Sequence, residues 1–553
     1  MALIEVLRLV PPPHCEFNKQ ALEHNLNGRR KLAIKVVDLF AGPGGLGEGF
    51  SAHYMKGKEN VFEIVLSIEK EKHAFETLKL RTFFRRFRGD APREYYSYLK
   101  GELELQNLYD AYPDQSRESE DRCWQKEIGL DEDAVSDVRR HIGSALDGDE
   151  LGVLIGGPPC QAYSLAGRSR NAGNPNYDPD KDRRQKLYID YLQVVADHSP
   201  AVFIMENVKG LLSATMHEQS VFNRIVEDLR NPTEALRREK RKTASRRHSI
   251  YRIHSLTDGS LLLNGNVKSA VVRAEHYGIP QSRHRVILLG LRDDLGVSNP
   301  PTMTPSPEVT LKNVIGDLPK LRSGLSGNDS DANWRDALRS QSGSNWIKGK
   351  PGRLDQAEFS EFMKAQMGRI SPPRLGRGKE FIESETSPEH EPGWFKDARL
   401  KGITHHRARS HMASDLWRYF YAECYARFNK SSPTLTDMPR DLLPEHANVQ
   451  KAIKSGGNFS DRFRVQLWDK PATTVVSHIS KDGHYYIHPD PQQCRSLTVR
   501  EVARVQTFPD NYYFMGNRTA QYVQVGNAVP PLLAYQIAGV VNEIFLRLQS
   551  VQD

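Results

Sequence analysis

The stretch Lys35–Phe50, KVVDLFAGPGGLGEGF, runs from an apolar segment directly into a cluster of glycines. Its apolar part is typical of a strand buried in a parallel or mixed sheet. The glycines that follow let the backbone take tight or positive-φ turns, and they let a ligand lie against bare main chain beside the amides that begin a helix. A plain strand-to-helix turn would use the same residues. The stretch therefore predicts a strand, a turn and a helix, with a nucleotide-like ligand as one of two interpretations.

The next apolar run, Phe62–Ile68, ends at Glu69. An acid at the tip of a second strand can accept hydrogen bonds from both hydroxyls of a ribose, as in dinucleotide sites. It can equally cap a helix. Taken together, the glycine turn and Glu69 favour a cofactor that contains adenosine.

Short apolar runs continue to alternate with helical or loop segments as far as residue 294, which predicts an α/β domain. The expected strands are Ile34–Leu39, Phe62–Ile68, Leu151–Ile155, Ala201–Met205, Ala270–Ala274 and Val286–Leu289. Residues 295–460 are richer in Pro, Gly, Ser, Arg and His, with one helical pattern in SDLWRYFYAECYARF. We expect a smaller, irregular module there. From residue 461 strand and helix patterns return, so we expect 461–553 to rejoin the first domain, 1–294.

The bulk composition is that of a folded, globular protein with a mild positive charge. The 553 residues carry 77 Lys+Arg against 69 Asp+Glu, a net charge of +8 that suits a polyanionic partner and many other enzymes. Five scattered cysteines without a CxxC pair argue against a disulfide framework and a zinc cage. The short N-terminal apolar run contains an acid and lacks a basic flank, so we expect neither a signal peptide nor a membrane anchor.

The segment VLIGGPPCQAYS, residues 153–164, carries the strongest chemical signal. Two prolines fix φ after a buried strand, so they hold Cys160 at the carboxyl edge of the sheet, where open α/β sheets bind ligands. Buried cysteines usually act as small hydrophobes. Prolines and polar neighbours make that interpretation a poor one here, and Cys160 is the predicted nucleophile.

Two later segments add charged groups. AVFIMENVKGLLS places Glu206 directly after an apolar strand, where a carboxylate can hold a proton near neutrality or be an ordinary surface acid. HYGIPQSRHRVILLGL places Gln281, Arg283 and Arg285 at alternate positions, which predicts that they share one face of a strand. They could bind a phosphate or a base carbonyl, or form a salt-bridged strand edge.

These segments resemble the motifs of one family, the cytosine-C5 DNA methyltransferases of bacterial restriction-modification type. DLFAGPGGLGEGF resembles the family's cofactor turn, GGPPCQAYS its nucleophile loop, MENVKGLL its glutamate motif and QSRHR its arginine motif. RSLTVREVARVQTFPD and YVQVGNAVPPLLA resemble its last two motifs, and all of them occur in the family's order. The resemblance implies a Rossmann-like, S-adenosylmethionine-dependent methyltransferase sheet, with the target recognition domain at 295–460.

The resemblance also implies roles for individual residues. Cys160 would attack carbon 6 of a flipped-out cytosine, Glu206 would bind ring N3, and Arg283 and Arg285 would complete the catalytic group, with Arg285 on the cytosine O2. The implied cofactor contacts are Phe40, Ala41, Gly42, Gly44, Gly45, Leu46, Glu69, Pro158, Asn527 and Val529. The implied DNA contacts are Gln161, Ser164, Arg168, Arg170 and Gln281. For the acid that contacts adenine, Asp90, Asp147 and Asp149 compete and none is assigned.

The remaining expectations concern partners and location. S-adenosylmethionine is the expected methyl donor, without a metal, and double-stranded DNA is the expected partner. We expect a monomer in a bacterial or phage-infected cytoplasm, with a cognate restriction endonuclease as a candidate companion. The basic run 238–248 is interpreted either as a phosphate contact or as a solvated helix face. His405, His406 and His411 are expected at the surface or facing DNA, because no cysteine partner is near.

Three alternatives stay open. A cytosine-C5 methyltransferase acting on tRNA shares these motifs, although such proteins are usually shorter. A methyltransferase of exocyclic amino groups would need an acid or amide before Pro-Pro, which this chain lacks. A non-catalytic DNA-binding regulator is disfavoured because Cys160, Glu206 and Arg285 are all present.

Overall fold

A computed structural model of the chain describes residues 33–54, 60–129, 132–159, 187–216, 219–245, 248–263, 268–348, 354–445, 449 and 460–552. The chain divides into two compact units. The sheet unit consists of the described residues within Asn27–Tyr95, Leu105–Pro307 and Ala528–Asp553. The second unit consists of those within Tyr96–Glu104 and Glu308–Asn527.

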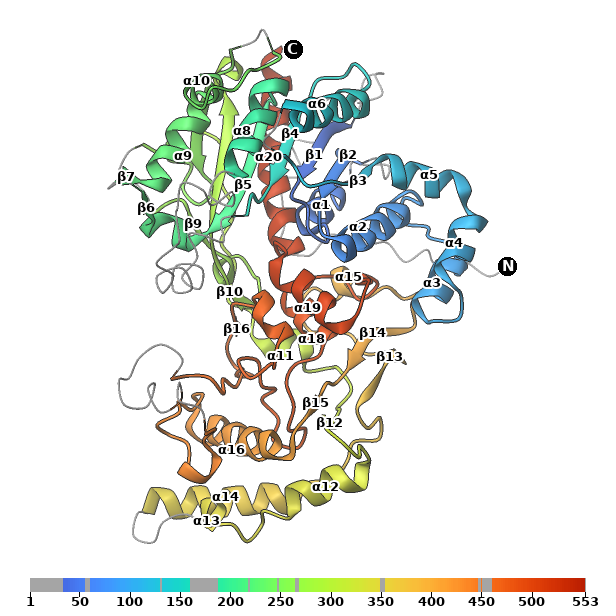
Figure 1. The fold of residues 1–553 in the computed structure, drawn as a ribbon, viewed down its shortest axis with the longest axis vertical. Coiled ribbons are helices and arrows are strands. Elements are labelled where there is room, and N and C mark those ends of the chain that lie inside the picture. The colour runs from blue at the N-terminus through green and yellow to red at the C-terminus, as the bar shows by residue number, and fades with distance from the viewer. Residues whose placement is uncertain are drawn as a thin grey trace. The chain divides into compact units, whose positions relative to one another are not determined.

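One mixed sheet organises the sheet unit (Figure 1). Its strands are β1 (Ile34–Leu39), β2 (Phe62–Glu69), β3 (Cys123–Gln125), β4 (Val153–Gly156), β5 (Val202–Val208), β8 (Tyr251–Ser255), β9 (Val271–Arg273) and β11 (His284–Arg292). The order across the sheet is β3-β2-β1-β4-β5-β11-β8, and β9 also pairs with β11. The strands from β3 to β5 are parallel, whereas β11 is antiparallel to each of its neighbours.

The strand order reverses between β1 and β4. From β1 the chain steps to β2 and β3 on one side, then returns to β4 and continues to β5 on the other. Because crossover connections are right-handed, helices of the two halves lie on opposite faces of the sheet. Such a switch point leaves a crevice at the carboxyl ends of β1 and β4, which is where open α/β sheets bind ligands.

The helices of the sheet unit follow the predicted alternation. They are α1 (Gly45–Ser51), α2 (Lys72–Arg85), α4 (Leu105–Ala111), α5 (Pro113–Asp121), α6 (Glu132–Leu146), α8 (Leu187–His198), α9 (Val221–Arg230), α10 (Pro232–Arg238) and α20 (Pro531–Gln552), with 3-10 turns η4 (Lys209–Ser213), η5 (Ala274–His276) and η6 (Asp293–Leu295). Short strands β6 (Thr215–Met216), β7 (Gln219–Ser220) and β10 (Gln281–Ser282) complete the unit, and α3 (Arg93–Leu99) crosses the boundary between the units. The predicted α/β fold class is confirmed.

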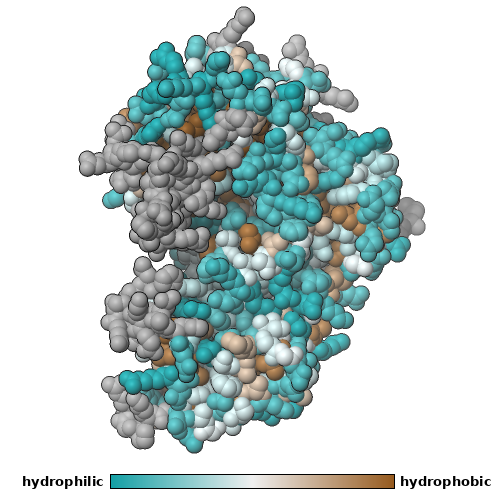
Figure 2. Space-filling view, viewed as in Figure 1, coloured by the Kyte–Doolittle hydropathy of each residue, from teal (hydrophilic) through white to brown (hydrophobic). Residues whose placement is uncertain are grey.

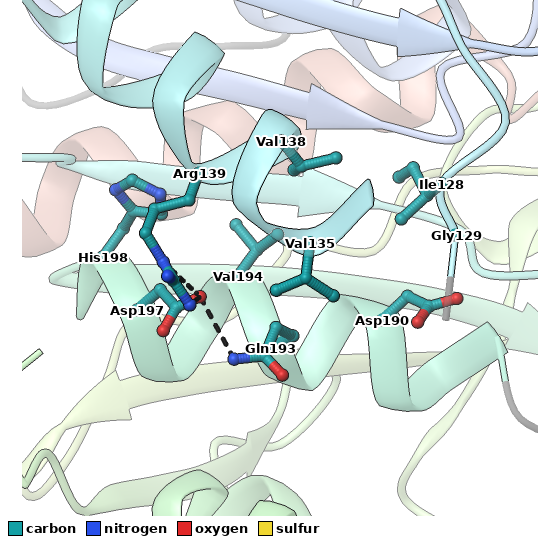
Figure 3. A pocket seen from close by; sticks show the side chains of 10 residues that line it. All are labelled: Ile128, Gly129, Val135, Val138, Arg139, Asp190, Gln193, Val194, Asp197 and His198. Carbon is teal, nitrogen blue, oxygen red and sulfur yellow. Dashed lines mark hydrogen bonds and ion pairs between the residues drawn. The ribbon is translucent and has the colours of Figure 1, made fainter. Parts of the chain in front are cut away.

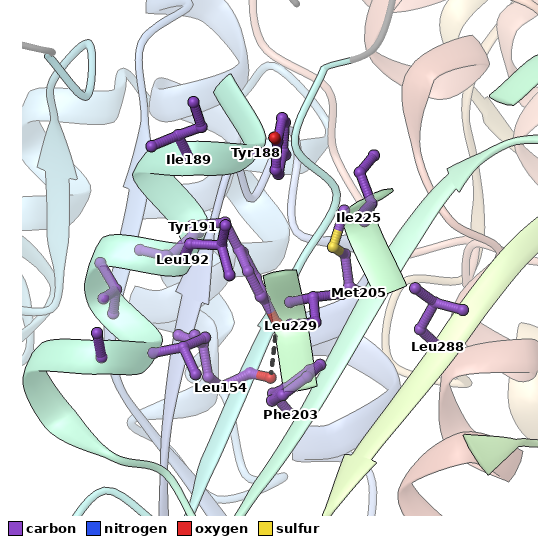
Figure 4. Close-up of a cluster of buried hydrophobic side chains, with 14 of the residues drawn as sticks. Leu154, Tyr188, Ile189, Tyr191, Leu192, Phe203, Met205, Ile225, Leu229 and Leu288 are labelled. Atoms are coloured by element: carbon purple, nitrogen blue, oxygen red, sulfur yellow. Dashed lines mark hydrogen bonds between the residues drawn. The ribbon is translucent and has the colours of Figure 1, made fainter. Parts of the chain in front are cut away.

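A continuous apolar core joins the sheet to α6, α8 and α9 (Figure 4). Tyr191 of α8 has no exposed surface, and its hydroxyl donates to the carbonyl of Ile204 at 3.0 Å and of Leu154 at 3.4 Å. Phe203 of β5 is equally buried and fills the space beside Gly290, where a Cβ would overlap its ring. Burial of this kind contributes most of the free energy that stabilises a domain.

The last helix, α20, packs against α1 although nearly five hundred residues separate them. A Cβ on Gly49 would overlap backbone atoms of Ala534 and Tyr535, so only glycine permits this approach. Helix α20 belongs to a stretch, Arg518–Ser550, that by length and composition could cross a membrane, but 61% of its most apolar window is buried inside the protein. It is therefore the core helix that the sequence predicts at Pro530–Leu548.

The second unit contains its own helices and short sheets. They are α11 (Leu311–Ile315), β12 (Gly324–Leu325), α12 (Asp331–Arg339), α13 (Asn345–Lys348), α14 (Leu354–Gly368), β13 (Gly378–Glu383), α15 (Pro392–Phe395), β14 (Gly402–Arg407), β15 (Ser410–His411), α16 (Ala413–Asn429), η7 (Arg440–Leu442), β16 (Ala472–Thr473), η8 (Ser477–Ser480), α18 (Val499–Val505) and α19 (Arg518–Asn527). A separate core forms around α16, with Trp334 and Phe420 fully buried. The predicted helix in SDLWRYFYAECYARF is confirmed as α16, whereas α12 and α14 were not predicted.

The compact units and the predicted domains divide the chain at different residues. Contacts keep 461–527 in the second unit and return the chain to the sheet unit only from Ala528. Buried arginines supply some of these contacts. Arg504 donates to Asp317 Oδ1 at 2.6 Å and to the carbonyl of Val314 at 3.0 Å, and Arg500 donates to the carbonyl of Thr404 at 3.0 Å. Which part of the chain recognises the target stays a prediction.

The surface agrees with the charged composition. Figure 2 shows a mainly hydrophilic face with hydrophobic residues at scattered positions. Large exposed hydrophobic residues are few among the described residues, and Met412 is the most exposed of them at 56%. Scattered exposure of this kind is normal for a folded domain.

The close approach of α1 and α20 gives a first prediction. Gly49→Ala should lower the free energy of unfolding by about 1–3 kcal/mol, because the added methyl group must displace the backbone of α20. Gly143→Ala on α6 is the matched control, since its Cβ would meet nothing within 4 Å. Gly143→Ala should raise the free energy of unfolding by up to about 1 kcal/mol. Thermal melting of both variants measures the two signs, and equal effects would contradict the packing argument.

Candidate active site

The turn after β1 has the geometry that the glycines predict. Phe40, Gly42 and Gly44 all have positive φ, at 54°, 57° and 97°. Gly44 is the N-cap of α1 and carries no side chain to cover the first amides of that helix. The backbone therefore presents amides at the switch point between β1 and β4.

Glu69, at the end of β2, is fixed beside this turn. Its Oε2 accepts from the Gly42 amide at 2.8 Å, and its Oε1 accepts from the Glu71 amide at 2.8 Å. Burial raises the pKa of Glu69, and the two amides oppose that shift. The carboxylate is thus held between the first two strands by backbone donors, while Glu71 caps α2 with its own side chain.

Three further residues shape the same turn. A Cβ on Gly45 would overlap the carbonyl oxygen of Val529, so the chain's last segment closes against the start of α1. Leu46 is buried behind it, and the Ala41 amide donates to the Ile68 carbonyl at 3.1 Å. A Cβ on Gly42 would meet nothing within 4 Å. This open space beside a fixed carboxylate fits the ribose end of an adenosine cofactor.

The ends of β4 and β5 bring the next two motifs together. The Glu206 carboxylate lies against Gly157, where a Cβ would be 3.1 Å from Oε2. The side-chain Nδ2 of Asn207 donates to the Pro158 carbonyl at 3.3 Å. Gly157 and Pro158 lie three and two residues before the predicted nucleophile, Cys160, in the sequence. A larger residue at 157 would displace the carboxylate.

Arg285 forms an ion pair with Glu206, with 2.9 Å between Nε and Oε1. In the antiparallel pairing of β11 with β5, Ile287 lies opposite Glu206, so Arg285 is its diagonal neighbour on the same face. Both side chains are mostly buried, at 13% and 14% exposed. A guanidinium and a carboxylate so placed offer fixed donors and acceptors to a polar ring.

Arg283 and Gln281 lie close by in the chain but do not continue this strand. Gln281 belongs to β10, and Arg283 lies between β10 and β11, so the regular alternation that the sequence predicts is interrupted there. Both residues are buried: Arg283 is 2% exposed and Gln281 is 0% exposed. His284, between the two arginines, pairs with Glu275 at 2.6 Å.

Several predicted site residues are not brought into this group by the structure. Five of them, Cys160, Gln161, Ser164, Arg168 and Arg170, lie outside the described residues. Asn527 is the last residue of α19 in the second unit. The other predicted cofactor residues all belong to the sheet unit.

The three acids considered for adenine are all misplaced for that role. Asp149 pairs with Lys35 at 3.5 Å, which puts Asp147 and Asp149 at the amino end of β1. Asp90 follows the far end of α2, which leads away from the carboxyl edge. The third strand is β3, and the acid that follows it is Glu127, 3.5 Å from Lys70.

A buried charge cluster under the glycine turn was not predicted. Glu48 of α1 pairs with Arg81 and Arg85 of α2, and all three are at most 10% exposed. Burial by itself would raise the pKa of Glu48, but the two arginines lower it to about 2. Asp38 of β1 has no exposed surface, and Arg85 and the Gly47 amide are the groups that favour its charged form. Burial raises the pKa of Asp38 to about 8.

One expectation about basic residues is wrong. His405, His406 and His411 are at most 5% exposed, not at the surface. His405 contacts the Phe514 carbonyl at 3.1 Å and His406 contacts the Pro319 carbonyl at 2.9 Å, so they are core residues. Burial lowers the pKa of both, to about 3 and about 4.

The basic run 238–248 is not a continuous helix face in its described part, and its contact with phosphate stays a prediction. Helix α10 ends at Arg238, which pairs with Asp228. Arg241 pairs at 3.1 Å with Asp190, which is 1% exposed. These ion pairs attach the run to α8 and α9.

Figure 3 shows a small pocket between α6 and α8, lined by residues such as Val138, Asp190 and Val194. An ion pair at 3.0 Å between Arg139 and Asp197 crosses it. None of the predicted site residues lines this pocket. Among the described residues no group of three His, Cys, Asp or Glu side chains could hold a metal ion.

The fold and this arrangement together define a class. A sheet with a switch point between β1 and β4, a glycine turn after β1, an amide-bound glutamate after β2 and a Glu–Arg pair beside the end of β4 is a Rossmann-like methyltransferase architecture.

Comparison with known proteins gives the family. A family model described as C-5 cytosine-specific DNA methylase matches residues 121–232 and 263–543, which is more than half of the chain. The type II methyltransferase M.Bpa9945I of Bacillus paralicheniformis is 32% identical over 92% of this chain and 98% of its own length. M.AgeI of Thalassovita gelatinovora is 25% identical over 92% of this chain and 99% of its own length.

A solved structure from Escherichia coli, described as a DNA modification methyltransferase encoded within a prophage, is 19% identical with a TM-score of 0.48 and covers 93% of this chain and 100% of its own. The chain belongs to the C-5 cytosine-specific DNA methylase family. Its enzyme class is DNA (cytosine-5-)-methyltransferase, of the type II restriction-modification kind. The expected family is thereby confirmed.

The raised pKa of Asp38 predicts a pH-dependent stability. Below pH 3.8 the carboxyl is protonated in the folded and unfolded chains alike, whereas up to about pH 8 only the unfolded chain ionises. Folded stability therefore falls as pH rises through this window. Asp38→Asn removes the effect, so its melting temperature should rise relative to wild type between about pH 6 and about pH 8.

Asp114→Asn on α5 is the control for that measurement, because its side chain is 75% exposed. A melting temperature for Asp38→Asn that keeps a constant offset from wild type across the same pH range would show that Asp38 is not the responsible group.

Proposed function

We propose that the enzyme transfers a methyl group from S-adenosylmethionine to carbon 5 of a flipped-out cytosine in a specific duplex sequence, through a covalent intermediate on Cys160. The proposal includes protection of DNA within a restriction-modification system. One observation carries it. Glu206, paired with Arg285 at 2.9 Å, lies against Gly157, three residues before Cys160 in the sequence.

The chemistry of cytosine explains why these groups are needed together. Carbon 5 is a poor nucleophile until a nucleophile adds to carbon 6 and the ring becomes an enamine. In our proposal the Cys160 thiolate forms the bond to carbon 6, and Glu206 shares a proton with ring N3 to take up the developing negative charge. Arg285 binds the O2 carbonyl from the same side. Its pairing with Glu206 supports this, because one cytosine edge presents both N3 and O2.

When bound, S-adenosylmethionine supplies the sulfonium methyl group. Glu69, held by the amides of Gly42 and Glu71, is proposed to bind the ribose hydroxyls, with the turn Phe40–Leu46 and Val529 around the methionine part. After methyl transfer a base takes the carbon 5 proton, the bond between carbon 6 and sulfur breaks, and the thiolate returns. Pro158, Asn527 and the proposed DNA contacts Gln161, Ser164, Arg168, Arg170, Gln281 and Arg283 stay part of this proposal.

The target base must leave the helix before any of this can occur. Stacking shields carbon 6 in duplex DNA, so extrusion costs a few kcal/mol. The proposed partner is therefore double-stranded DNA. The proposed oligomeric state is a monomer.

We propose Glu127, in place of the three aspartates, as the acid that contacts the adenine amine, because it follows β3 next to the ribose site.

The proposal is tested by incubating the protein with methyl-labelled S-adenosylmethionine and either duplex DNA or tRNA, and locating the modified base. We expect 5-methylcytosine in DNA. Cys160→Ala should reduce turnover by at least about 10⁴-fold while leaving cofactor affinity within about a factor of two. Methylation confined to tRNA or to adenine, or turnover that survives in Cys160→Ala, would contradict it.

The Glu206–Arg285 pair gives a separate prediction. Glu206→Gln keeps the size of the side chain but removes the proton donor, so kcat should fall about 10²–10⁴-fold with little change in KM for the cofactor. Glu63→Gln is the control, because Glu63 pairs with Lys35 at the amino end of the sheet. Equal kcat values for Glu206→Gln and wild type would remove Glu206 from the mechanism.

A further inference from the structure

Four arginines from distant parts of the chain gather on the second unit. Arg377 precedes β13, Arg407 ends β14, Arg409 follows two residues later, and Arg518 begins α19. We call these four residues the arginine surface. Gly378 of β13 pairs with Arg407, and the Ala408 amide donates to the Arg377 carbonyl at 2.8 Å, so the first two arginines are neighbours across the hairpin.

The other two arginines, Arg409 and Arg518, lie at α19. The guanidinium of Arg409 lies 4.6 Å from the ring centre of Tyr522, one helical turn from Arg518. Burial lowers the pKa of Arg518, Tyr522 and Glu380 oppose that shift, and the charges of Arg407 and Arg377 add to it. The charges of Arg409 and Arg518 both help burial to lower the pKa of His411. Electrostatic interactions therefore link all four residues.

The backbone is shaped to hold this group. A Cβ on Gly378, which has a φ of +79°, would overlap the His406 carbonyl, so the hairpin closes only with glycine at that position. A Cβ on Gly324 would lie 2.9 Å from the Arg377 guanidinium carbon. Arg409 is oriented by the carbonyls of Ile479 and Lys481, which accept from it at 2.9 and 3.2 Å.

Acidic residues balance only part of the charge of the arginine surface. Arg407 is 3.6 Å from Glu380, and both side chains are substantially exposed, at 43% and 55%. Arg377 is 3.2 Å from Asp329, which is shared with Arg322 at 2.6 Å. Within the described part of the chain, neither Arg409 nor Arg518 forms an ion pair with a carboxylate. Positive charge is therefore concentrated here at an electrostatic cost.

A bound polyanion would offset the repulsion among these arginines. Guanidinium groups match phosphate oxygens in geometry as well as in charge. We propose that the arginine surface binds phosphate groups of the sugar-phosphate backbone of duplex DNA. The inference rests on the proposed function, because duplex DNA is the substrate there. Phosphate contacts fix the register of a protein on DNA and carry no sequence information.

The test uses the salt dependence of DNA binding. Each phosphate contact contributes about 0.9 to the slope of log Kd against log salt concentration, whatever the sequence. A fluorescein-labelled duplex of mixed sequence is therefore a sufficient probe, with anisotropy as the readout. Arg407→Gln/Arg518→Gln should reduce that slope by about 1–2 and weaken binding about tenfold or more at low salt.

Two matched variants sharpen the test. Glu380→Gln removes the acid that lies 3.6 Å from Arg407, so binding should become tighter. Arg335→Gln on α12 is the control, because Arg335 is similarly exposed at 39% but has its own partner, Asp336, at 3.0 Å. It should leave the slope unchanged. Cofactor binding and melting temperature, measured for every variant, verify that each one is folded.

The outcomes separate this inference from the proposed function. Wild-type protein that methylates DNA, together with an Arg407→Gln/Arg518→Gln variant whose salt slope equals that of Arg335→Gln, overturns the inference alone. Wild-type protein that neither binds nor methylates duplex DNA overturns the proposed function and the inference with it. A reduced slope for the double variant and tighter binding for Glu380→Gln support the inference.

Discussion

The contact between α1 and α20 is the constraint on which the catalytic half of this protein depends. Two glycines of α1 leave room for backbone from the end of the chain, Gly45 for Val529 and Gly49 for Ala534. The turn that precedes α1 carries the proposed cofactor contacts. Since its position is fixed by a helix nearly five hundred residues later, the proposed site is complete only once the last segment has packed.

Buried charged residues stabilise the same region. Glu48 lies between two arginines of α2, which ties α1 to α2 beneath the glycine turn. Breaking a buried ion pair by removing one partner costs about 3–5 kcal/mol. Asp38 adds a fully buried carboxyl near the end of β1, close to Arg85 and the Gly47 amide. Buried groups of this kind make the turn rigid, and a rigid turn lets backbone amides act as preformed donors.

The two units use arginine in different ways. In the sheet unit, Arg285 is committed to Glu206 and to the chemistry proposed there. In the second unit, Arg500 and Arg504 are fully buried and bind carbonyls and carboxylates, which joins α18 to segments before residue 410. Arg407 is 43% exposed and Arg518 is partly buried. Fully buried arginines thus hold the fold of this unit, while more accessible ones supply charge that the nearby acids balance only in part.

Sequence by itself determined the sheet, its glycine turn and the order of the motifs, because hydrophobic periodicity and glycine placement are local properties. Strands β1, β2, β4, β5, β9 and β11 were all predicted within a few residues. Strands β3 and β8 were not predicted, β3 because Cys123–Gln125 is three residues long between charged helices, and the acid for adenine was left unassigned.

Only the tertiary structure decided which charges meet. The pairing of Glu206 with Arg285 depends on the register between β5 and β11, and the burial of His405 and His406 depends on carbonyls about a hundred residues away. The limits of the second unit, too, follow from arginines that reach back across the chain. Local sequence patterns contain none of these long-range contacts, so the fold was predictable where periodicity governs it and the electrostatics were not.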